Sequence, residues 1–208
     1  MLRAGLTGGI ACGKSAVAEM FASLGAHILN ADTLAHELYR PGEPVYKKLV
    51  KRFGREIVKP DGAIDRSKLA ALAFDGGRVE DLNRIVHPAV IVRQQELMAV
   101  IGAKDPNAVV LAEAALIFEA GAGERFDKII VVTCKQEQKA ARLAQRMGID
   151  EAAAQVEVER RMKSQIADEE KARRADYVID NSGSLEETRR QVEKVFTELK
   201  ALAGRGAV

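Results

Sequence analysis

Short apolar segments alternate with longer amphipathic ones along this chain of 208 residues. Apolar runs of strand length occur at Leu2–Thr7, Ala26–Asn30, Ala108–Ala112, Lys128–Thr133 and Asp176–Asp180. Several are apolar at consecutive positions, which is typical of strands covered by helices on both faces of a sheet. Because strands and helices alternate, the pattern predicts an α/β fold with a five-stranded parallel sheet flanked by helices.

Amphipathic segments between these runs predict the helices. Helical spacing occurs at Val45–Phe53 and Arg66–Phe74. His87-Pro88 is expected to open a long helix that ends before Gly102, because proline suits a first helical turn. Ser184-Leu185-Glu186-Glu187 has the form of a capping box, which predicts the start of the last helix. The end of the chain, Ala203–Val208, is expected to fray.

Two stretches are too long to be simple crossovers between strands. Residues 33–106 read as a mostly helical insertion broken by Pro-Gly turn signals. Residues 136–174 are strongly charged and helical, and most of their basic side chains read as a solvated face. We expect residues 1–32, 107–135 and 175–208 to form the core. The basic residues of 136–174, together with Lys135 just before them, are Lys135, Lys139, Arg142, Arg146, Arg160, Arg161, Lys163, Lys171, Arg173 and Arg174.

Composition narrows the class of protein. Hydrophobic residues make up 47% and charged residues 30%, which is typical of a globular protein, and no apolar run is long enough to span a membrane. A net charge of +2, no Trp and 4% aromatic residues argue against a nucleic-acid partner. The two cysteines, Cys12 and Cys134, suggest neither a disulfide framework nor a zinc site. Without a signal peptide before Leu2, a cytoplasmic location is expected.

A phosphate-binding motif follows the first strand. Gly8-Gly9-Ile10-Ala11-Cys12-Gly13-Lys14-Ser15 has the form G-x-x-x-x-G-K-[ST], and helical spacing begins after Lys14. Its backbone N–H groups can turn toward phosphate oxygens, Lys14 can reach the β- and γ-phosphates, and Ser15 can offer a hydroxyl to Mg²⁺. Cys12 reads as a small residue whose backbone matters, with redox sensitivity as an alternative. The motif predicts binding of ATP or GTP.

Other residues separate the classes of nucleotide-binding protein. A guanine-specific switch would need an N-K-x-D motif, and no Asn in this chain is followed by Lys. A small-molecule kinase needs a carboxylate near the acceptor hydroxyl, and Asp32 follows the second strand at the edge where ligands of such sheets bind. The alternative role for Asp32 is the N-cap of a helix beginning at Thr33. A non-catalytic nucleotide-binding adaptor would need neither Asp32 nor an arginine cluster.

Further candidates have structural alternatives. Arg142 and Arg146 lie four residues apart on one helix face, and Arg161 follows in the next helix, so they could close over the transferred phosphoryl group or lie on the surface. Glu113 ends the third strand, where it could hold Mg²⁺ through water or be an ordinary strand-end acid. His87 could bind substrate or cap the helix at Pro88.

The chain resembles bacterial dephospho-CoA kinases over nearly its whole length. In order and spacing, the matching segments are Gly5–Ser15, Ala31–Asp32, Leu82–Pro88, Leu116–Glu119, Arg142–Leu143 with Arg146 and Gly148, Arg161 with Gln165, and Ala175–Gly183. The sequence departs from the family pattern at Asn30, where many members have Asp, at Ala115 in place of a frequent Pro, and at Cys12 in place of a frequent Ser.

The resemblance implies a P-loop kinase of the nucleoside-monophosphate-kinase type. It implies transfer of the ATP γ-phosphoryl group, with Mg²⁺, to the ribose 3′-hydroxyl of dephospho-CoA, and a monomer or weak homo-oligomer with no nucleic-acid or membrane partner. Residues 33–106 would bind the acceptor and residues 136–174 would be the lid. Another small-molecule kinase on the same scaffold is the alternative.

The expected roles of individual residues follow. The catalytic residues would be Asp32, Lys14 and Arg142, and the acceptor-binding residues Asp32, His87, Arg146 and Arg161. Mg²⁺ would be held by Ser15, with Glu113 acting through water. The nucleotide would contact Gly9, Ala11, Cys12, Gly13, Lys14, Ser15, Ala16 and, on the adenine side, Asn181 and Gly183.

Overall fold

The computed structural model describes residues 1–205, which divide into two compact units. The first unit contains Met1–Leu29 and the chain from Val100 onward, and the second contains Asn30–Ala99. Within the described residues, no helix combines the length and apolar character that crossing a membrane requires.

The first unit is built on a parallel sheet. The described strands are β1 (Leu2–Gly8), β2 (His27–Asn30), β3 (Val109–Glu113), β4 (Lys128–Thr133) and β5 (Tyr177–Asp180), in the spatial order β2-β3-β1-β4-β5. In the central strand, Leu6 pairs with Glu113 of β3 and Thr7 pairs with Val131 of β4. The five-stranded sheet predicted from the apolar runs is confirmed, with strand ends shifted by at most one residue.

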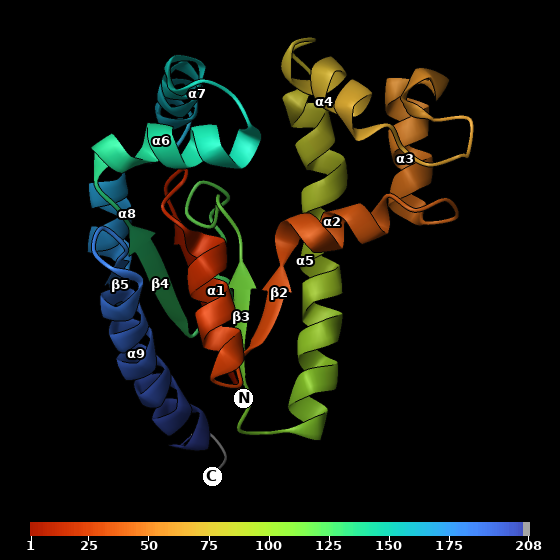
Figure 1. Cartoon of the computed structure of the whole chain (residues 1–208). Coiled ribbons are helices and arrows are strands. Elements are labelled where there is room, and N and C mark those ends of the chain that lie inside the picture. The colour runs from red at the N-terminus through yellow and green to blue at the C-terminus, as the bar shows by residue number, and fades with distance from the viewer. Residues whose placement is uncertain (206–208) are drawn as a thin grey trace. The chain divides into compact units, whose positions relative to one another are not determined.

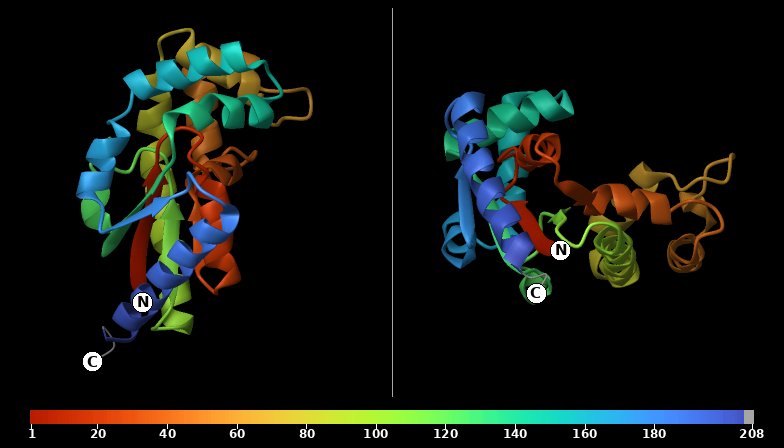
Figure 2. Two further views of the ribbon diagram at one scale, coloured as in Figure 1. Left: turned by 60° about the vertical axis from the view of Figure 1, so that its left-hand side comes forward. Right: turned by 90° about the horizontal axis from the view of Figure 1, so that it is seen from below.

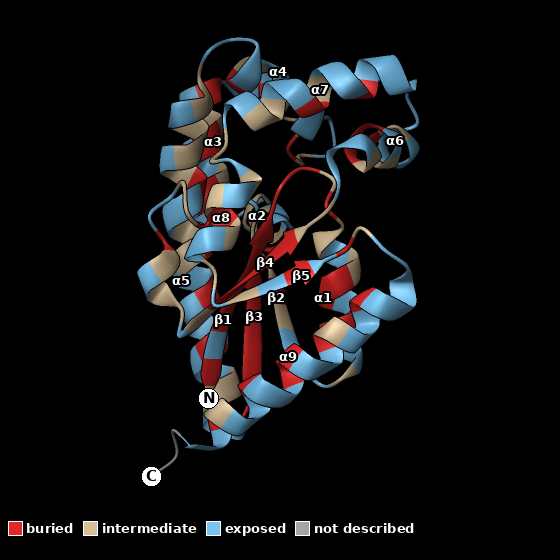
Figure 3. Ribbon diagram, turned by 90° about the vertical axis from the view of Figure 1, so that its left-hand side faces the viewer, coloured by how far each residue is buried: buried red, intermediate tan, exposed pale blue. Residues whose placement is uncertain are grey.

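Helices cover both faces of this sheet (Figures 1 and 2). Helices α1 (Lys14–Ser23) and α9 (Leu185–Arg205) pack together on one face, where Ile130 and Val132 of β4 join the main apolar core. On the other face, Ile129 and Val131 of β4 pack against Ile117 and Ala122 in the segment after β3. Helix α8 (Asp168–Arg174) also contacts β4. Figure 3 shows the central strands as buried, which accounts for their consecutive apolar residues.

The charged segment of the first unit folds into α6 (Gln136–Met147), α7 (Glu151–Lys163) and α8. Figure 1 shows α6 crossing beyond the C-terminal ends of the strands, next to the loop that follows β1. An apolar cluster joins this loop to the two helices, because Ile10 packs with Leu143 of α6 and with Ala154 and Val158 of α7. The helices therefore rest directly on the phosphate-binding motif.

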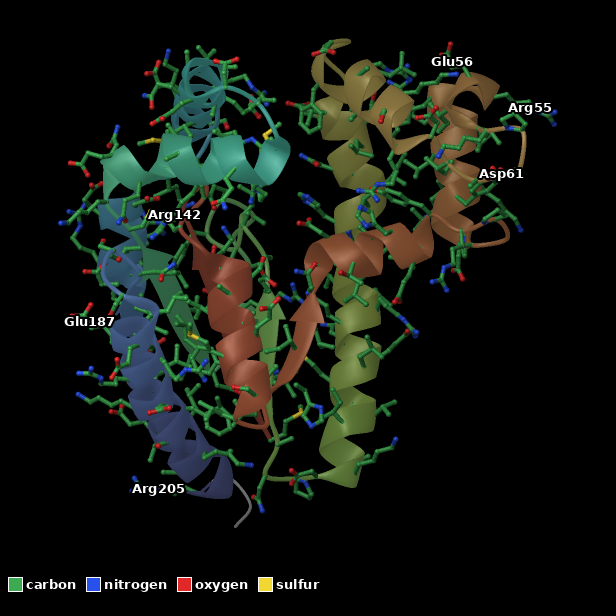
Figure 4. All side chains as sticks on the ribbon, in the orientation of Figure 1. Arg55, Glu56, Asp61, Arg142, Glu187 and Arg205 are labelled. Atoms are coloured by element: carbon green, nitrogen blue, oxygen red, sulfur yellow. The ribbon has the colours of Figure 1, made fainter. Side chains whose placement is uncertain are left out.

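The start of α9 has the predicted capping box, formed by Ser184 and by Glu187, which is labelled in Figure 4. The Glu187 carboxylate accepts the Ser184 N–H at 2.8 Å, and the Ser184 hydroxyl accepts the Glu187 N–H at 3.2 Å. The prediction of a frayed end is wrong for Ala203–Arg205, which continue α9, with Ala203 buried in the core. Residues 206–208 lie outside the described residues.

The second unit is helical. It contains α2 (Ala31–Leu38), α3 (Pro44–Phe53), the short 3₁₀ helix η1 (Arg55–Ile57), α4 (Arg66–Phe74) and most of α5 (Val79–Lys104). The start predicted for α5 at His87-Pro88 is wrong, since Pro88 lies inside the helix. Glu80 and Asp81 lie in the true first turn, where acidic side chains are favoured by the helix dipole. The helix continues through Pro88 even though proline has no backbone N–H and one helical hydrogen bond is missing there.

Candidate active site

The loop after β1 turns sharply at the carboxyl edge of the sheet. A β-carbon on Gly8 would lie 2.2 Å from the backbone oxygen of Val132, and one on Gly13 would lie 2.2 Å from the Asn181 side-chain nitrogen. Gly13 also has a φ of 85°, and Ala11 shares the left-handed region with a φ of 55°. Glycine is therefore required at both positions, and the loop leads into the N-terminus of α1, where backbone N–H groups favour a phosphate.

Lys14, the first residue of α1, folds back over this loop. Its ammonium donates hydrogen bonds to the backbone oxygens of Gly8 at 3.0 Å and Gly9 at 3.1 Å. Burial lowers the pKa of Lys14, and the positive charge of Arg146 acts in the same direction. Negative phosphate oxygens beside this ammonium would favour its charged form. The Lys14 ammonium therefore already lies within the loop, where phosphate oxygens would contact it.

Ser15 and Glu113 come together next to the loop. The Ser15 hydroxyl donates a hydrogen bond to the Glu113 carboxylate at 3.0 Å, although 98 residues separate them. Glu113 ends β3 and is only 7% exposed. Hydroxyl and carboxylate oxygens are donors that Mg²⁺ prefers, and Mg²⁺ commonly keeps several waters, so two protein groups are a fitting donor set. Within the described residues, no cluster of three or more His, Cys, Asp or Glu side chains offers a metal site.

Asn181, which directly follows β5, holds the phosphate-binding loop in place through a hydrogen bond. Its buried side-chain N–H₂ donates to the Cys12 backbone oxygen at 2.9 Å, and its side-chain oxygen accepts from the Thr188 hydroxyl at 2.9 Å. The side-chain amide expected on the adenine side is therefore engaged with the phosphate-binding loop and α9. Gly183 follows in the same turn and is exposed.

Arg142 projects from α6 toward this turn (Figure 4). Its Nη2 donates to the Asn181 backbone oxygen at 2.9 Å. Its Nη1 is buried and has no hydrogen-bond partner among the described residues. Arg142 therefore keeps a buried donor next to the residue that holds the phosphate-binding loop.

The other two arginines of the expected cluster differ from Arg142. Arg146 is exposed on the next turn of α6, yet its charge acts on Lys14. Arg161 is half-buried on α7, where its Nε donates to the Glu157 carboxylate at 2.6 Å. Arg160 joins this contact, and the hydrogen bonds from the two arginines lower the pKa of Glu157 to about 2.

Asp32 belongs to the second unit and lies in the first turn of α2 with its side chain exposed. The alternative in which Asp32 is the N-cap is wrong. The cap is Asn30, whose side-chain oxygen accepts the Thr33 N–H at 2.9 Å. The structure thus gives a local role to the residue that departs from the family pattern, and it leaves the Asp32 carboxylate outside the cap.

His87 also belongs to the second unit and lies inside α5; the residue is exposed, yet partial burial of its ring lowers the pKa of the imidazole. The alternative of a helix cap at His87 is therefore wrong as well. The same unit contains a pocket of about 530 Å³ that sequence reasoning did not predict. Its lining includes the cations Lys59 and Arg66, the anion Asp65, the polar side chain of Tyr39 and the apolar side chain of Phe74.

Comparison with known proteins identifies the family. The family model for dephospho-CoA kinase matches residues 2–187. The chain belongs to the dephospho-CoA kinase family. It is 44% identical over 200 residues to the dephospho-CoA kinase of Aquifex aeolicus, which covers 96% of this chain and 98% of that protein. The family predicted from the ordered motifs is confirmed, and with it the class of ATP-dependent kinase.

Solved structures agree with this assignment. The chain is similar to TT1252 from Thermus thermophilus, with a TM-score of 0.76 and 34% identity, covering 95% of this chain and 97% of that one. It is also similar to the dephospho-CoA kinase from Campylobacter jejuni, with a TM-score of 0.62 and 27% identity over 95% and 96% of the two chains. The predicted fold class is confirmed at the level of the whole chain.

In this family member, two lysines of the charged segment do not lie on a solvated face. Lys139 of α6 is 3% exposed, and its ammonium lies 2.7 Å from the Asp168 carboxylate. A β-carbon on Gly9 would collide with that same carboxylate, and the Cys12 sulfur lies 3.8 Å from it. Asp168 therefore ties the start of α8 to the phosphate-binding loop, a role that sequence reasoning missed.

Lys171 is the second buried lysine, with no exposed surface at all. Its ammonium lies 2.9 Å from Glu119, in the segment after β3, and 3.3 Å from the Gln165 side-chain oxygen. Glu119 also accepts the Ile166 N–H at 3.0 Å. These contacts fix the connection between α7 and α8 to the core. The sequence shows the charges, but it does not show which opposite charges meet.

Proposed function

We propose that this protein transfers the γ-phosphoryl group of ATP to the ribose 3′-hydroxyl of dephospho-CoA. Family membership supports the reaction, and the observation in this chain that carries it is the contact between Ser15 and Glu113 beside the Lys14 loop. A carboxylate paired with the motif's hydroxyl is the arrangement that a metal-bound nucleotide triphosphate requires. A loop that only binds phosphate would not need it.

On the nucleotide side, the chain's own groups bind and orient the triphosphate. Backbone N–H groups of Gly9 to Ala16 and the Lys14 ammonium hold the phosphates, and Asn181 keeps the loop in place through Cys12. Ser15 and Glu113 would hold Mg²⁺, which when bound neutralises charge on the phosphates. Arg142 supplies its free Nη1 donor to the transferred group.

On the acceptor side, Asp32 accepts the proton of the 3′-hydroxyl as that oxygen bonds to the γ-phosphorus and ADP leaves. Its exposed carboxylate, free of the helix cap, supports this role. His87, Arg146 and Arg161 bind the acceptor, and residues 33–106 form its binding region. In the pocket of this unit, Asp65 is engaged as the cap of α4, and the two positive groups beside apolar ones suit a substrate with a pyrophosphate and a long chain.

Residues 136–174 act as a lid that excludes water from the transfer. Amide hydrogen exchange tests this with a non-hydrolysable ATP analogue and dephospho-CoA. We expect ligands to protect α6 and α7 more than the central strands. Arg142→Ala should lower turnover more than it raises the Michaelis constant for dephospho-CoA. Unchanged exchange together with a fully active Arg142→Ala enzyme would rule the lid out.

An acceptor screen tests the reaction itself. The purified protein is given ATP and Mg²⁺ with dephospho-CoA, AMP, CMP, shikimate or pantothenate, and phosphorus NMR locates the new phosphate. We expect dephospho-CoA to be the best acceptor, with the phosphate on its 3′-oxygen. Turnover of AMP or shikimate without turnover of dephospho-CoA would refute the proposal. We also expect a monomer or weak homo-oligomer in the cytoplasm.

A further inference from the structure

We propose that Cys12 and Cys134 are a redox modification site, in which a peroxide converts the two thiols into a disulfide that switches off the phosphate-binding loop. The proposal rests on nucleotide binding at that loop and not on the identity of the acceptor. It uses two residues that the proposed reaction does not need as thiols.

The two sulfur atoms already lie 3.2 Å apart, although 122 residues separate them in the sequence. Cys12 is a loop residue between β1 and α1, and Cys134 directly follows β4, the neighbouring parallel strand. A disulfide has an S–S distance of about 2.05 Å, so bond formation requires an approach of only about 1 Å. No rearrangement of the sheet is needed to bring the pair together.

The surroundings make Cys134 the sulfur that reacts first. Cys134 is partly exposed, whereas Cys12 is fully buried. The hydrogen bond between the two sulfur atoms lowers the pKa of Cys134 to about 7, and the charges of Arg142 and Lys139 act in the same direction, whereas burial and the charge of Asp168 act in the opposite direction. The hydrogen bond and burial raise the pKa of Cys12. A partly exposed thiolate with a neighbouring second thiol is the arrangement of redox-sensitive cysteines.

The chemistry balances with hydrogen peroxide as the oxidant. The Cys134 thiolate attacks one peroxide oxygen, the O–O bond breaks, and a sulfenic acid forms while hydroxide leaves and is protonated to water. The Cys12 sulfur then attacks the Cys134 sulfur, the S–S bond forms, and the S–O bond breaks, with the Cys12 proton leaving in a second water. Two thiols lose two electrons in total, and a dithiol reductant returns them.

The disulfide would act on the loop because Cys12 is part of it. The Cys12 backbone oxygen accepts the Asn181 hydrogen bond, and Ala11 and Gly13 on either side occupy left-handed conformations. Such a backbone has little freedom to follow a side chain that moves by about 1 Å without losing its geometry. A misplacement of this size can cost about 10²-fold in an active site. We expect oxidation to weaken ATP binding as well as turnover.

The test treats the reduced, purified protein with hydrogen peroxide. Intact mass should fall by two hydrogens, and peptide mapping should find a Cys12–Cys134 cross-link. Binding of a non-hydrolysable ATP analogue and phosphoryl transfer should each fall by at least about tenfold and return with dithiothreitol. Because analogue binding needs no acceptor, this readout remains valid even if dephospho-CoA is not the acceptor.

Cys134→Ser and Cys134→Ala are the control variants, since Cys134 lies outside the binding residues. Both should keep basal analogue binding and resist peroxide. If one variant does not fold, the other variant and the peptide mapping of the oxidised wild-type protein still test whether the cross-link forms and causes the loss of binding. Absence of the cross-link in oxidised wild-type protein would overturn the proposal. So would a cross-linked protein that binds the analogue as tightly as the reduced one, or a variant that loses binding as fast as the wild type.

Discussion

The residues proposed to bind the nucleotide and the two acceptor-binding candidates of the second unit, Asp32 and His87, are prepared in opposite ways. In the first unit, contacts within the protein hold each group. Lys14 donates to two backbone oxygens, Ser15 donates to Glu113, and Asn181 bonds to both Cys12 and Thr188. In the second unit, Asp32 and His87 are exposed, and neither side chain hydrogen-bonds another described residue.

This difference separates the expected effects of substitution. Groups held by the fold are pre-organised for a triphosphate, which lowers the cost of ordering them when it binds. Groups exposed on helices are left for the substrate to engage. Substitutions on the nucleotide side should therefore change nucleotide binding or stability, in addition to any effect on turnover, whereas those at the exposed acceptor residues should change turnover with little effect on nucleotide binding or folding.

Asp32→Asn should have the largest effect on turnover. Asparagine keeps the shape of the side chain but cannot accept the acceptor proton, and a general base contributes about 10²–10⁴-fold. Since Asn30 is the helix cap, stability should change by less than about 1 kcal/mol. The matched control is Asn30→Ala, which should lower stability by about 1 kcal/mol. Steady-state kinetics and thermal melts on the Asp32→Asn and Asn30→Ala variants measure these two effects. A fully active Asp32→Asn enzyme would show that Asp32 is not the general base.

Lys14→Ala should lower turnover by about 10²–10³-fold, because it removes a positive charge from the transferring phosphoryl group. The fold should survive, since the change removes a cation whose pKa is already lowered by burial. Lys194→Ala, an exposed lysine of α9, is the control for loss of a positive charge. A Lys14→Ala enzyme that keeps a tenth of wild-type turnover at saturating ATP would contradict the assignment.

Lys171→Met should be the most destabilising of these changes. It leaves the Glu119 carboxylate without its cation, and breaking a buried pair costs about 3–5 kcal/mol. The exposed Lys163→Met should change stability by less than about 0.5 kcal/mol. Adding Glu119→Gln to Lys171→Met should restore part of the loss. Urea unfolding of the wild type, the two single variants and the double variant measures these changes in stability. A Lys171→Met protein as stable as the wild type would show that the pair does not hold the α7–α8 connection.

Glu157→Gln should have the smallest effect, within about 1 kcal/mol for a pair at the surface. The pKa of Glu157 in the folded protein, about 2, lies below its ordinary value of 4.5. Its contribution is therefore present above about pH 4.5 and is lost as the pH falls toward 2. Thermal melts should show a difference between wild type and Glu157→Gln at pH 7 that shrinks below pH 4. A constant difference would mean that the charge of Glu157 is not its cause.

The sequence predicted the features that local patterns determine. Apolar runs located the strands, the glycine motif located the phosphate-binding loop, and Ser184 with Glu187 located the start of α9. Local signals failed where several residues competed for one role. Asn30 and Asp32 both suit a helix cap, and only the structure shows that Asn30 takes it.

Long-range contacts were beyond sequence reasoning. Lys139 and Lys171 look like the other basic residues of a charged helical segment, and their burial depends on Asp168 and Glu119 arriving from elsewhere in the fold. The 3.2 Å approach of Cys134 to Cys12 has the same origin, because it follows from the pairing of β1 with β4. Register and packing, which no single segment encodes, decide these partners.

Calorimetric titration of a non-hydrolysable ATP analogue tests the contrast between the two sets of residues most directly. Lys14→Ala should weaken binding by at least about tenfold, since a charge-assisted hydrogen bond contributes about 1.5–3 kcal/mol. Asp32→Asn, although it loses turnover, should bind the analogue within about twofold of wild type, a difference below 0.5 kcal/mol on the scale where 1.4 kcal/mol is tenfold. Equal weakening in both variants would contradict the account, because the nucleotide would then depend on the exposed acceptor residue.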